Sequence, residues 1–446
     1  MTRTQAEASP TQGRRILREV DLPLARLLGG ILAATWLTIA APLQAAEARP
    51  DADVPVDYRA LMRSTVDALI ASQTQSGLFP YGFDFLADQP LEPGRVSPEN
   101  LIRQAGTASA LAAYYQRTHD PRLRETLQRI LAAFDRHSLP IGKSRLQRWI
   151  ERAHLLSIPF ARWRLQTALL RHGLLYEPEG EGKVISSNGK YDIAAAGTVA
   201  LALLAELRYA DASGDDHYAA LRASWLRGLL DLRIPGGGFR WLPTSIDDTP
   251  YYNGEGWLAL AVYRDLHPED TTVAAELDDL DRAMIERYTQ QPDPDFYSWG
   301  AMAAAQRYRT TRDGRFLAFL RGQAKLFLAR FRGRLEADAN NCDAMEGAAA
   351  TLGILETEGG ADGELAQRLQ TWVTAEAAKL PRMQLRSGQG ALVLGGDAKL
   401  SAPRMAGFGG AFLMGLYDPS TRVDLMQHCL SAMVMLDRAG RPSSPR

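Results

Sequence analysis

The densest group of side chains that could do chemistry lies in residues 240–260, which read RWLPTSIDDTPYYNGEGWLAL. This segment combines basic, aromatic, amide and acidic side chains: Arg240, Trp241, Tyr251, Tyr252, Asn253 and Glu255. Glycines on both sides of Glu255 would let a ligand approach the backbone closely. A carboxyl group in such a place can act as a general acid or base, although a glutamate in the first turn of a helix can also simply cap it.

Two further stretches place ionisable side chains at helical spacing. Asp343 and Glu346 would share one helix face at i, i+3, and Asp424 and His428 would share another at i, i+4. A histidine one turn from a carboxylate is an oriented general base or a metal ligand, and the same pair can equally be a buried structural interaction. The candidate catalytic residues are therefore Glu255, Asp343, Asp424 and His428.

Candidate substrate-binding residues lie at the start of other helices rich in small residues. Asn100 and Gln104 would share a face at i, i+4, with Arg103 beside them, and an arginine so close to an Ala- and Gly-rich helix needs a partner. Asn100 and Asp192 could instead cap their helices. Aromatic residues could stack on sugars or pack loops. The remaining candidates are Tyr81 and Asp84 in GLFPYGFDF, Tyr191 and Asp192, Trp299, and Glu346.

The chain has only two cysteines, Cys342 and Cys429, which excludes a disulfide-rich scaffold. They would lie on neighbouring helices, where an oxidising compartment allows a disulfide. The alternative is a zinc site made by Cys342, Asp343, His428 and Cys429, an arrangement similar to toroid zinc enzymes such as lanthionine cyclases and protein prenyltransferases. The order and spacing differ from theirs, and we expect no cofactor.

The elements that would position these residues alternate regularly. Six helices rich in Ala and Gly begin near Asn100, Asp192, Asn253, Phe296, Asn341 and Val423. Amphipathic helices are predicted between them, at about 57–75, 121–137, 216–233, 272–289, 315–335 and 362–380. This alternation predicts an all-α fold, an (α/α)6 toroid in which small residues let the inner helices pack closely. An open α-solenoid of the same hairpins is the alternative.

Loop lengths predict where the site lies. Connections that leave the small-residue helices are short turns, whereas those that enter them are often long, at 76–98, 178–191, 234–252 and 381–420. Because the helices alternate in direction, all long loops fall on the face that carries the N-termini of the small-residue helices. Unpaired N–H groups and positive dipole ends there suit anions and sugar oxygens.

The first 46 residues indicate an export signal, because arginines between positions 14 and 26 precede the apolar run 27–41. An uncleaved inner-membrane anchor is the alternative. We expect a periplasmic or secreted protein, with the toroid domain at 47–440, a helical insertion at 139–176 and a disordered tail at 441–446.

The composition is that of an ordinary globular protein, with 46% hydrophobic residues and a formal net charge of −1. A net charge so close to zero creates no strong electrostatic field around the protein, so we expect no nucleic-acid partner. We expect membrane contact only through an uncleaved N-terminal segment. The glycine-rich loop at 395–412 matches neither a P-loop nor a Rossmann pattern, which excludes those nucleotide sites.

The helix scheme and the segments YYNGEGWLAL, YSWGAMAAAQ and RVDLMQHCLSAMVML resemble the six-hairpin glycosidase-like toroid superfamily. The resemblance extends over most of residues 55–440 and is architectural, since no diagnostic motif of a single family is intact. It implies a carbohydrate-active enzyme, because the superfamily includes glycoside hydrolases, polysaccharide lyases and uronyl epimerases.

Our first hypothesis is a glycoside hydrolase that acts on an oligo- or polysaccharide, with Glu255 as the acid and Asp343 or Asp424 as the base of an inverting reaction. Arginines at the mouth would favour an acidic sugar. The second is a lyase or epimerase, in which a tyrosine or His428 removes a proton from a uronate. The third is a non-catalytic toroid that binds glycan or assists polysaccharide export or assembly proteins.

Overall fold

The computed structural model describes residues 56–93, 99–142, 180–359, 362–394 and 398–438, together with Trp149. The predicted export signal, most of the predicted insertion and the predicted tail lie outside the described residues. Within the described part of the chain, no helix is both long enough and apolar enough to cross a membrane.

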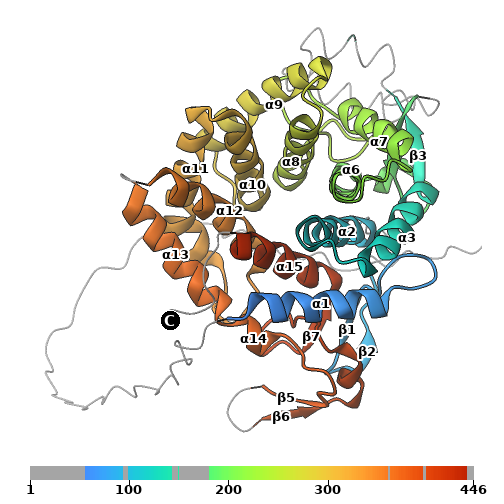
Figure 1. Cartoon of the computed structure of the whole chain (residues 1–446), viewed down its shortest axis with the longest axis vertical. Helices are drawn as coiled ribbons and strands as arrows, with labels where there is room; N and C mark the ends of the chain where they lie inside the picture. Colours follow the sequence, from blue (N-terminus) through green and yellow to red (C-terminus); the bar gives the residue numbers. More distant parts are fainter. Residues whose placement is uncertain are drawn as a thin grey trace, which may run out of the picture. The chain divides into compact units, whose positions relative to one another are not determined.

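Six inner helices form a closed ring in the described part of the chain (Figure 1). They are α2 (Glu99–Thr118), α6 (Ala196–Ser213), α8 (Pro250–Leu266), α10 (Pro294–Thr311), α12 (Cys342–Glu358) and α15 (Val423–Arg438). Each packs against the inner helices before and after it, and α15 packs against α2. This last contact closes the ring, so the predicted (α/α)6 toroid is confirmed and the open solenoid is excluded.

A second set of helices covers the outside of the ring. They are α1 (Tyr58–Ser72), α3 (Arg122–Arg136), α7 (Ala219–Asp231), α9 (Thr271–Gln290), α11 (Gly314–Leu326) and α13 (Gly363–Ala377). Their amphipathic sequences explain this place: in α3, Leu127, Ile130 and Phe134 recur at helical spacing and are fully buried, because α3 packs against α2 and α6.

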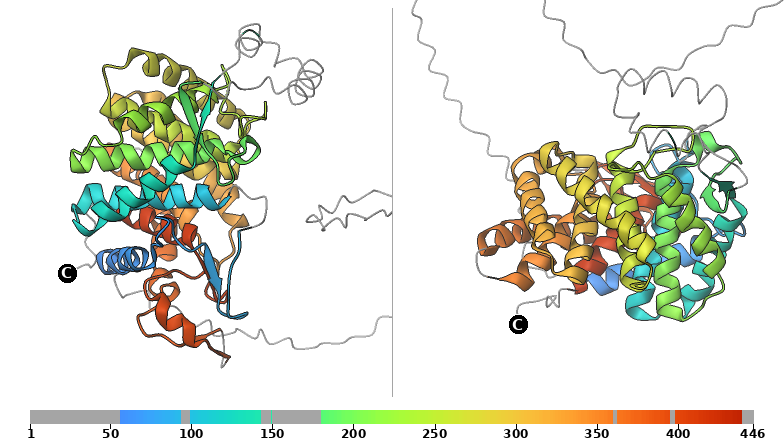
Figure 2. Two further views of the ribbon diagram at one scale, coloured as in Figure 1. Left: turned by 90° about the vertical axis from the view of Figure 1, so that its right-hand side faces the viewer. Right: turned by 90° about the horizontal axis from the view of Figure 1, so that it is seen from above.

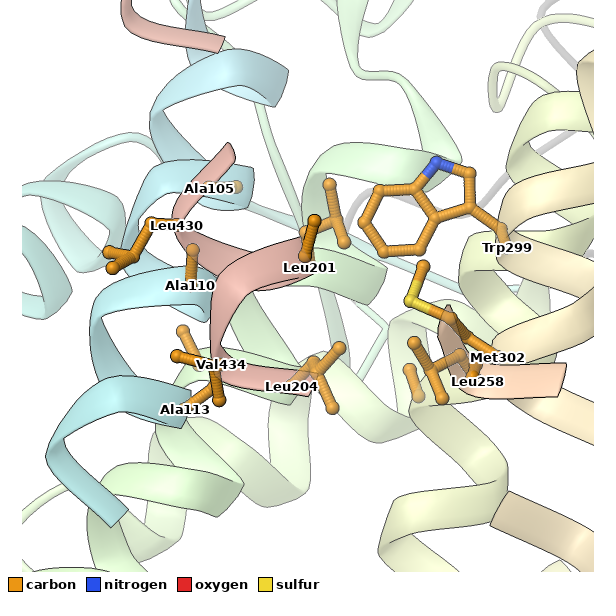
Figure 3. Packing of buried hydrophobic residues seen from close by; sticks show 14 of the residues in the cluster. Ala105, Ala110, Ala113, Leu201, Leu204, Leu258, Trp299, Met302, Leu430 and Val434 are labelled. Atoms are coloured by element: carbon orange, nitrogen blue, oxygen red, sulfur yellow. The ribbon is translucent and has the colours of Figure 1, made fainter. Parts of the chain in front are cut away.

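Small residues let the inner helices approach one another. A Cβ on Gly254 of α8 would lie 2.5 Å from Cβ of Trp299 on α10, and a Cβ on Gly347 of α12 would lie 2.8 Å from Cα of Ser298. Neither position accepts a larger residue without movement. Figure 3 shows apolar side chains from several inner helices, among them Leu201 and Met302, filling the centre of the ring.

Two inner helices begin at positions that differ from the prediction. α8 begins at Pro250 instead of Asn253, because the φ angle of proline is already set for the first helical position. Glu255 therefore lies in the second turn, and a first-turn capping role for it is wrong. α6 begins at Ala196, and Asp192 lies in a preceding 3-10 turn, so Asp192 is not the helix cap.

Short strands lie in the connections at one end of the helices (Figure 2). They are β1 (Gly82–Asp84), β2 (Gln89–Pro90), β3 (Ser138–Ile141), β4 (Gly182–Ile185), β5 (Ala391–Val393), β6 (Lys399–Ser401) and β7 (Ser420–Arg422). The antiparallel pairs are β1 with β2 and β7, β3 with β4, and β5 with β6. The β1–β7 pair places Tyr81 next to the start of α15, where the N–H of Val423 donates to the Tyr81 carbonyl.

Candidate functional site

A cavity of about 810 Å³, called the site cavity below, is lined mainly by the first turns of α2, α8, α12 and α15 and by the loop before α8. It lies where the loop lengths predict the site. The candidate residues that line it are Arg103, Trp241, Tyr251, Tyr252, Glu255, Asp343, Asp424 and His428.

Glu255 is buried in the wall of the site cavity, with 1% of its surface exposed. Its carboxyl group packs against Gly197 on α6, and Oε2 has no hydrogen-bond partner among the described residues. Burial raises the pKa of Glu255 well above its usual range; His428 lowers this pKa, and Glu346 raises it further. The carboxyl group therefore keeps its proton to a higher pH than an exposed glutamate does, which suits a general acid.

Gly197→Ala is expected to lower both activity and stability, because the new Cβ would lie 1.9 Å from Oε2 of Glu255 and 2.7 Å from Cδ1 of Tyr252. Overpacking of this kind lowers the free energy of unfolding by about 1–3 kcal/mol. Denaturant unfolding and steady-state kinetics measure the two effects. The matched control is Gly353→Ala on α12, where a Cβ meets no atom within 4 Å. Similar losses in both variants would show that contact with Glu255 is not the cause.

His428 on α15 and Glu346 on α12 form a buried pair, with 2.7 Å between Nδ1 and Oε2. Burial lowers the pKa of His428, but the charge and hydrogen bond of Glu346 outweigh burial and raise this pKa to about 9. The imidazole is therefore protonated at neutral pH, which suits the binding of an anionic group better than the removal of a proton. The sequence predicts a pair with Asp424, and the structure corrects the partner to Glu346.

Asp424 is held by two arginines instead. Its Oδ2 lies 2.9 Å from Nε of Arg103 and 2.8 Å from Nη2 of Arg422, and its Oδ1 lies 3.0 Å from Nε of Arg422. Arg103 also donates to the Tyr81 hydroxyl and lies over the Tyr81 ring. Because both carboxylate oxygens of Asp424 accept from guanidinium groups, Asp424 is better placed to position the arginines than to deprotonate water.

Asp343 is a more accessible carboxylate in the same cavity. Its side chain is exposed in the first turn of α12, and Oδ1 accepts a hydrogen bond of 2.7 Å from the N–H of Ala344. Asp343 has no ion-pair partner among the described residues. An exposed carboxylate without an arginine partner can accept a proton from a bound water molecule.

Aromatic side chains form one wall of the site cavity. Trp241 is 41% exposed, and Tyr251 and Tyr252 pack edge to face with 6.4 Å between ring centroids. Trp299, which the sequence predicts as a sugar-stacking residue, is buried behind this wall. Its ring lies 6.2 Å from that of Tyr251 and 6.3 Å from that of His428. Trp241 thus offers the accessible stacking surface, and Trp299 supports the wall.

Several polar residues predicted to bind substrate hold loops in place instead. Gln104 is fully buried and exchanges hydrogen bonds of 2.8 and 2.9 Å with the backbone of Phe79, and it also donates to Asn100. Asn253 is fully buried and accepts a 2.8 Å bond from the N–H of Phe239. These amides satisfy backbone groups of the connections that enter α2 and α8, so they do not line the cavity.

Four further candidates also lie outside the cavity lining. Arg240 is buried and donates to the carbonyl of Asp231 at 2.5 Å. Asp84 accepts from two backbone N–H groups of the turn that follows β1, and Tyr191 donates to a backbone carbonyl of β3. Asp192 is exposed beside Tyr191. Arg240, Asp84 and Tyr191 thus bind backbone groups of the protein itself, which the spacing along the sequence does not reveal.

Some polar residues of the site cavity were not among the predicted candidates. Asp247, Asp248, Asn340 and Arg422 line the site cavity. Asp248 is paired with Arg287, at 3.1 Å between Oδ1 and Nη2, so it is held in place. A usable signal was present, because Asp247 and Asp248 lie within three residues of the start of α8, and Arg422 directly precedes α15.

The structure distinguishes between the two alternatives for the cysteines, a disulfide and a zinc site. Cys342 on α12 and Cys429 on α15 form a disulfide, so Cys342 carries no thiolate for zinc. In the described part of the chain, no group of three or more His, Cys, Asp or Glu side chains is arranged to hold a metal ion. The disulfide joins two neighbouring inner helices next to Asp343 and His428.

The fold is similar to those of known proteins, although the sequence is not. No family model and no curated protein matches the sequence. The structure is similar to an inactive variant of the α-1,6-mannanase GH76A of Salegentibacter sp. HEL1_6 in complex with α-1,6-mannotriose, with 11% identity and a TM-score of 0.54 over 86% of this chain and 100% of that chain. It is also similar to an unsaturated glucuronyl hydrolase specific for heparin, with 11% identity and a TM-score of 0.50 over 87% and 99%. The chain therefore shares the (α/α)6 toroid fold with these two hydrolases.

Proposed function

We propose that this protein is a glycoside hydrolase that cleaves an acidic oligo- or polysaccharide with inversion at the anomeric carbon. The observation that carries the proposal is Glu255, because burial raises the pKa of its carboxyl group in the wall of a cavity that also exposes the carboxylate of Asp343. Inverting hydrolysis needs one protonated and one ionised carboxyl group on opposite sides of a sugar. The shared fold of known glycoside hydrolases supports the proposal.

In the proposed reaction, Glu255 donates its proton to the glycosidic oxygen as the bond between this oxygen and the anomeric carbon breaks. Asp343 removes a proton from a water molecule, whose oxygen bonds to the same carbon from the opposite side. The helices that carry the two residues, α8 and α12, are not neighbours, because α10 lies between them in the ring. Inverting pairs lie roughly 6.5–9.5 Å apart to leave room for the water.

An acidic substrate is supported by the cations of the site cavity. Arg103 and Arg422 line it together with the protonated imidazole of His428. Guanidinium groups bind carboxylates and sulfates through charge-assisted hydrogen bonds, and Asp424 holds these two in a fixed orientation. One structural neighbour is a glucuronyl hydrolase specific for heparin, which is itself an acidic polysaccharide.

A lyase or epimerase on the same face is less well supported. Such an enzyme needs a base that removes a carbon-bound proton of the uronate. Burial and the nearby Glu255 raise the pKa of Tyr251 well above its usual range, and the pKa of His428 is raised to about 9. Both groups hold their protons at neutral pH, so neither is suited to act as that base without a further change.

We also propose that the protein works outside the cytoplasm, in the periplasm or as a secreted protein. The arginines and the apolar run of residues 1–46 support an export signal. The Cys342–Cys429 disulfide supports the same conclusion, because disulfides persist in oxidising compartments and are rare in the cytosol.

The test is incubation of purified protein with acidic and neutral polysaccharides, following new reducing ends, the ultraviolet absorbance of unsaturated uronides, and the anomeric proton signals of the first product. We expect reducing ends of inverted configuration without absorbance. Asp343→Asn should abolish turnover, whereas Asp424→Asn should mainly raise KM. Absorbance would instead indicate a lyase, retained configuration would exclude the inverting mechanism, and binding without turnover would indicate a non-catalytic toroid.

A further inference from the structure

A second hollow, of about 870 Å³ and called the side groove below, lies between the short helix α14 (Leu380–Met383), the β5–β6 hairpin and residues 413–417. The segment 413–417 also forms part of the site cavity: Leu413 and Leu416 line the side groove, and Met414, between them, lines the site cavity. One short stretch of chain is therefore the wall between the two hollows.

This wall is fixed to the body of the ring. Gly415 forms an antiparallel bridge to Ala339, which lies just before α12 and also lines the site cavity. The N–H of Leu416 donates to the carbonyl of Asp338 at 2.8 Å, and the N–H of Leu413 donates to that of Met383 at 3.0 Å. The side groove is thus a preformed neighbour of the site cavity.

The lining of the side groove suits an anionic sugar chain. Arg382 and Arg386 are exposed in it, and neither guanidinium has an ion-pair or hydrogen-bond partner among the described residues. None of the described residues that line the side groove is acidic. Tyr417 is 50% exposed and offers an aromatic face. Charge, an aromatic surface and hydrogen-bonding groups together recognise a sugar with carboxylate or sulfate groups.

We propose that the side groove is a second binding site for an anionic polysaccharide, which holds the chain beside the site cavity. The inference rests on the proposed function for its substrate class. It assigns Arg382 and Arg386 to the acidic groups of the polymer and Tyr417 to stacking on a sugar ring. A short oligosaccharide that fills only the site cavity would not reach this groove, so the groove acts on long chains.

The first test measures binding without turnover. In a Glu255→Gln background, native gels that contain polygalacturonate, alginate, heparin or neutral dextran would be run with the Arg382→Ala/Arg386→Ala variant and with Tyr417→Ala. We expect at least one anionic polymer, and not dextran, to retard the parent protein. Each groove variant should bind that polymer roughly tenfold more weakly, and added salt should weaken binding by the parent. The matched control is Arg330→Ala/Arg332→Ala, which removes two exposed arginines that do not line the groove.

The second test uses turnover in the otherwise native protein. The groove variants should raise KM for the long polymer and leave kcat and the KM for a short oligosaccharide unchanged. An equal loss on short and long substrates, unchanged polymer binding, or the same loss in the control would overturn the inference. If no polysaccharide is hydrolysed, the proposed function fails, and the gels still decide whether the groove binds anionic polymer.

Discussion

Glu255→Gln is expected to lower kcat by about two to four orders of magnitude, because general acid catalysis contributes a factor of this size. The amide has nearly the shape of the protonated carboxyl group, so it should leave packing against Gly197 unchanged. Steady-state kinetics on the polysaccharide identified by the product assay would measure the loss. An aryl glycoside whose leaving group needs no proton should recover much of the lost rate.

The pH profile gives an independent check on the same residue. A general acid must be protonated, and the pKa of Glu255 is raised by burial, so activity should be lost only as the pH rises through this raised pKa. The alkaline limb set by Glu255 should disappear in Glu255→Gln.

The matched control is Glu206→Gln. Glu206 is also fully buried on an inner helix, and burial raises its pKa to about 7, but it pairs with Arg222 and does not line the site cavity. Its replacement should leave kcat nearly unchanged. Comparable losses in the two variants, or full activity of Glu255→Gln, would remove Glu255 from the mechanism.

His428→Gln is expected to lower the free energy of unfolding by about 3–5 kcal/mol near neutral pH, because removal of one partner of a buried pair leaves the other charge uncompensated. Here the group left behind is Glu346, which is fully buried and whose Oε2 accepts from His428. The double variant Glu346→Gln/His428→Gln removes both charges and should recover most of the loss. Denaturant unfolding of the three proteins measures these differences.

The sign of the pH dependence follows from the raised pKa of His428. Its contribution to stability is complete below the unfolded value of 6.5 and is lost as the pH rises through the folded value of about 9. The deficit of His428→Gln should therefore shrink above pH 9. It should also shrink in acid, where the raised pKa of Glu346 lets this buried carboxyl take up a proton. A deficit that does not vary with pH would point to packing alone.

The fold could be predicted from the sequence because a closed ring requires small residues in its inner helices. Inner helices must approach closely on both sides, and this requires glycine and alanine at contacts such as Gly254 against Trp299 and Gly347 against Ser298. Outer helices need only one apolar face. The two patterns alternate along the chain, and their alternation also places the site at the N-termini of the inner helices.

The choice among polar residues could not be predicted in the same way. Gln104 and Asn253 lie close in sequence to cavity residues, yet both bind backbone groups of incoming loops. Which amide faces a loop depends on where that loop passes, and the sequence does not specify this path. The predicted partner of His428, Asp424, was wrong for the same reason. Arg422, which lies outside any predicted helix, binds Asp424, and His428 pairs with Glu346 instead.

Ring closure also dictates the order in which the molecule can be completed. The hydroxyl of Thr107 on α2 donates to the carbonyl of Val423 at the start of α15, across 316 residues of chain. A protein made from its N-terminus at 5–20 residues per second would keep this flank of α2 without its final partner for roughly 15–60 s of synthesis. An open array of hairpins would bury each new flank with the next repeat. A ring cannot bury every flank in this way, because the first inner helix, α2, packs against the last inner helix, α15. Every truncation before α15 therefore leaves one uncovered flank on α2 and another on the last inner helix that remains.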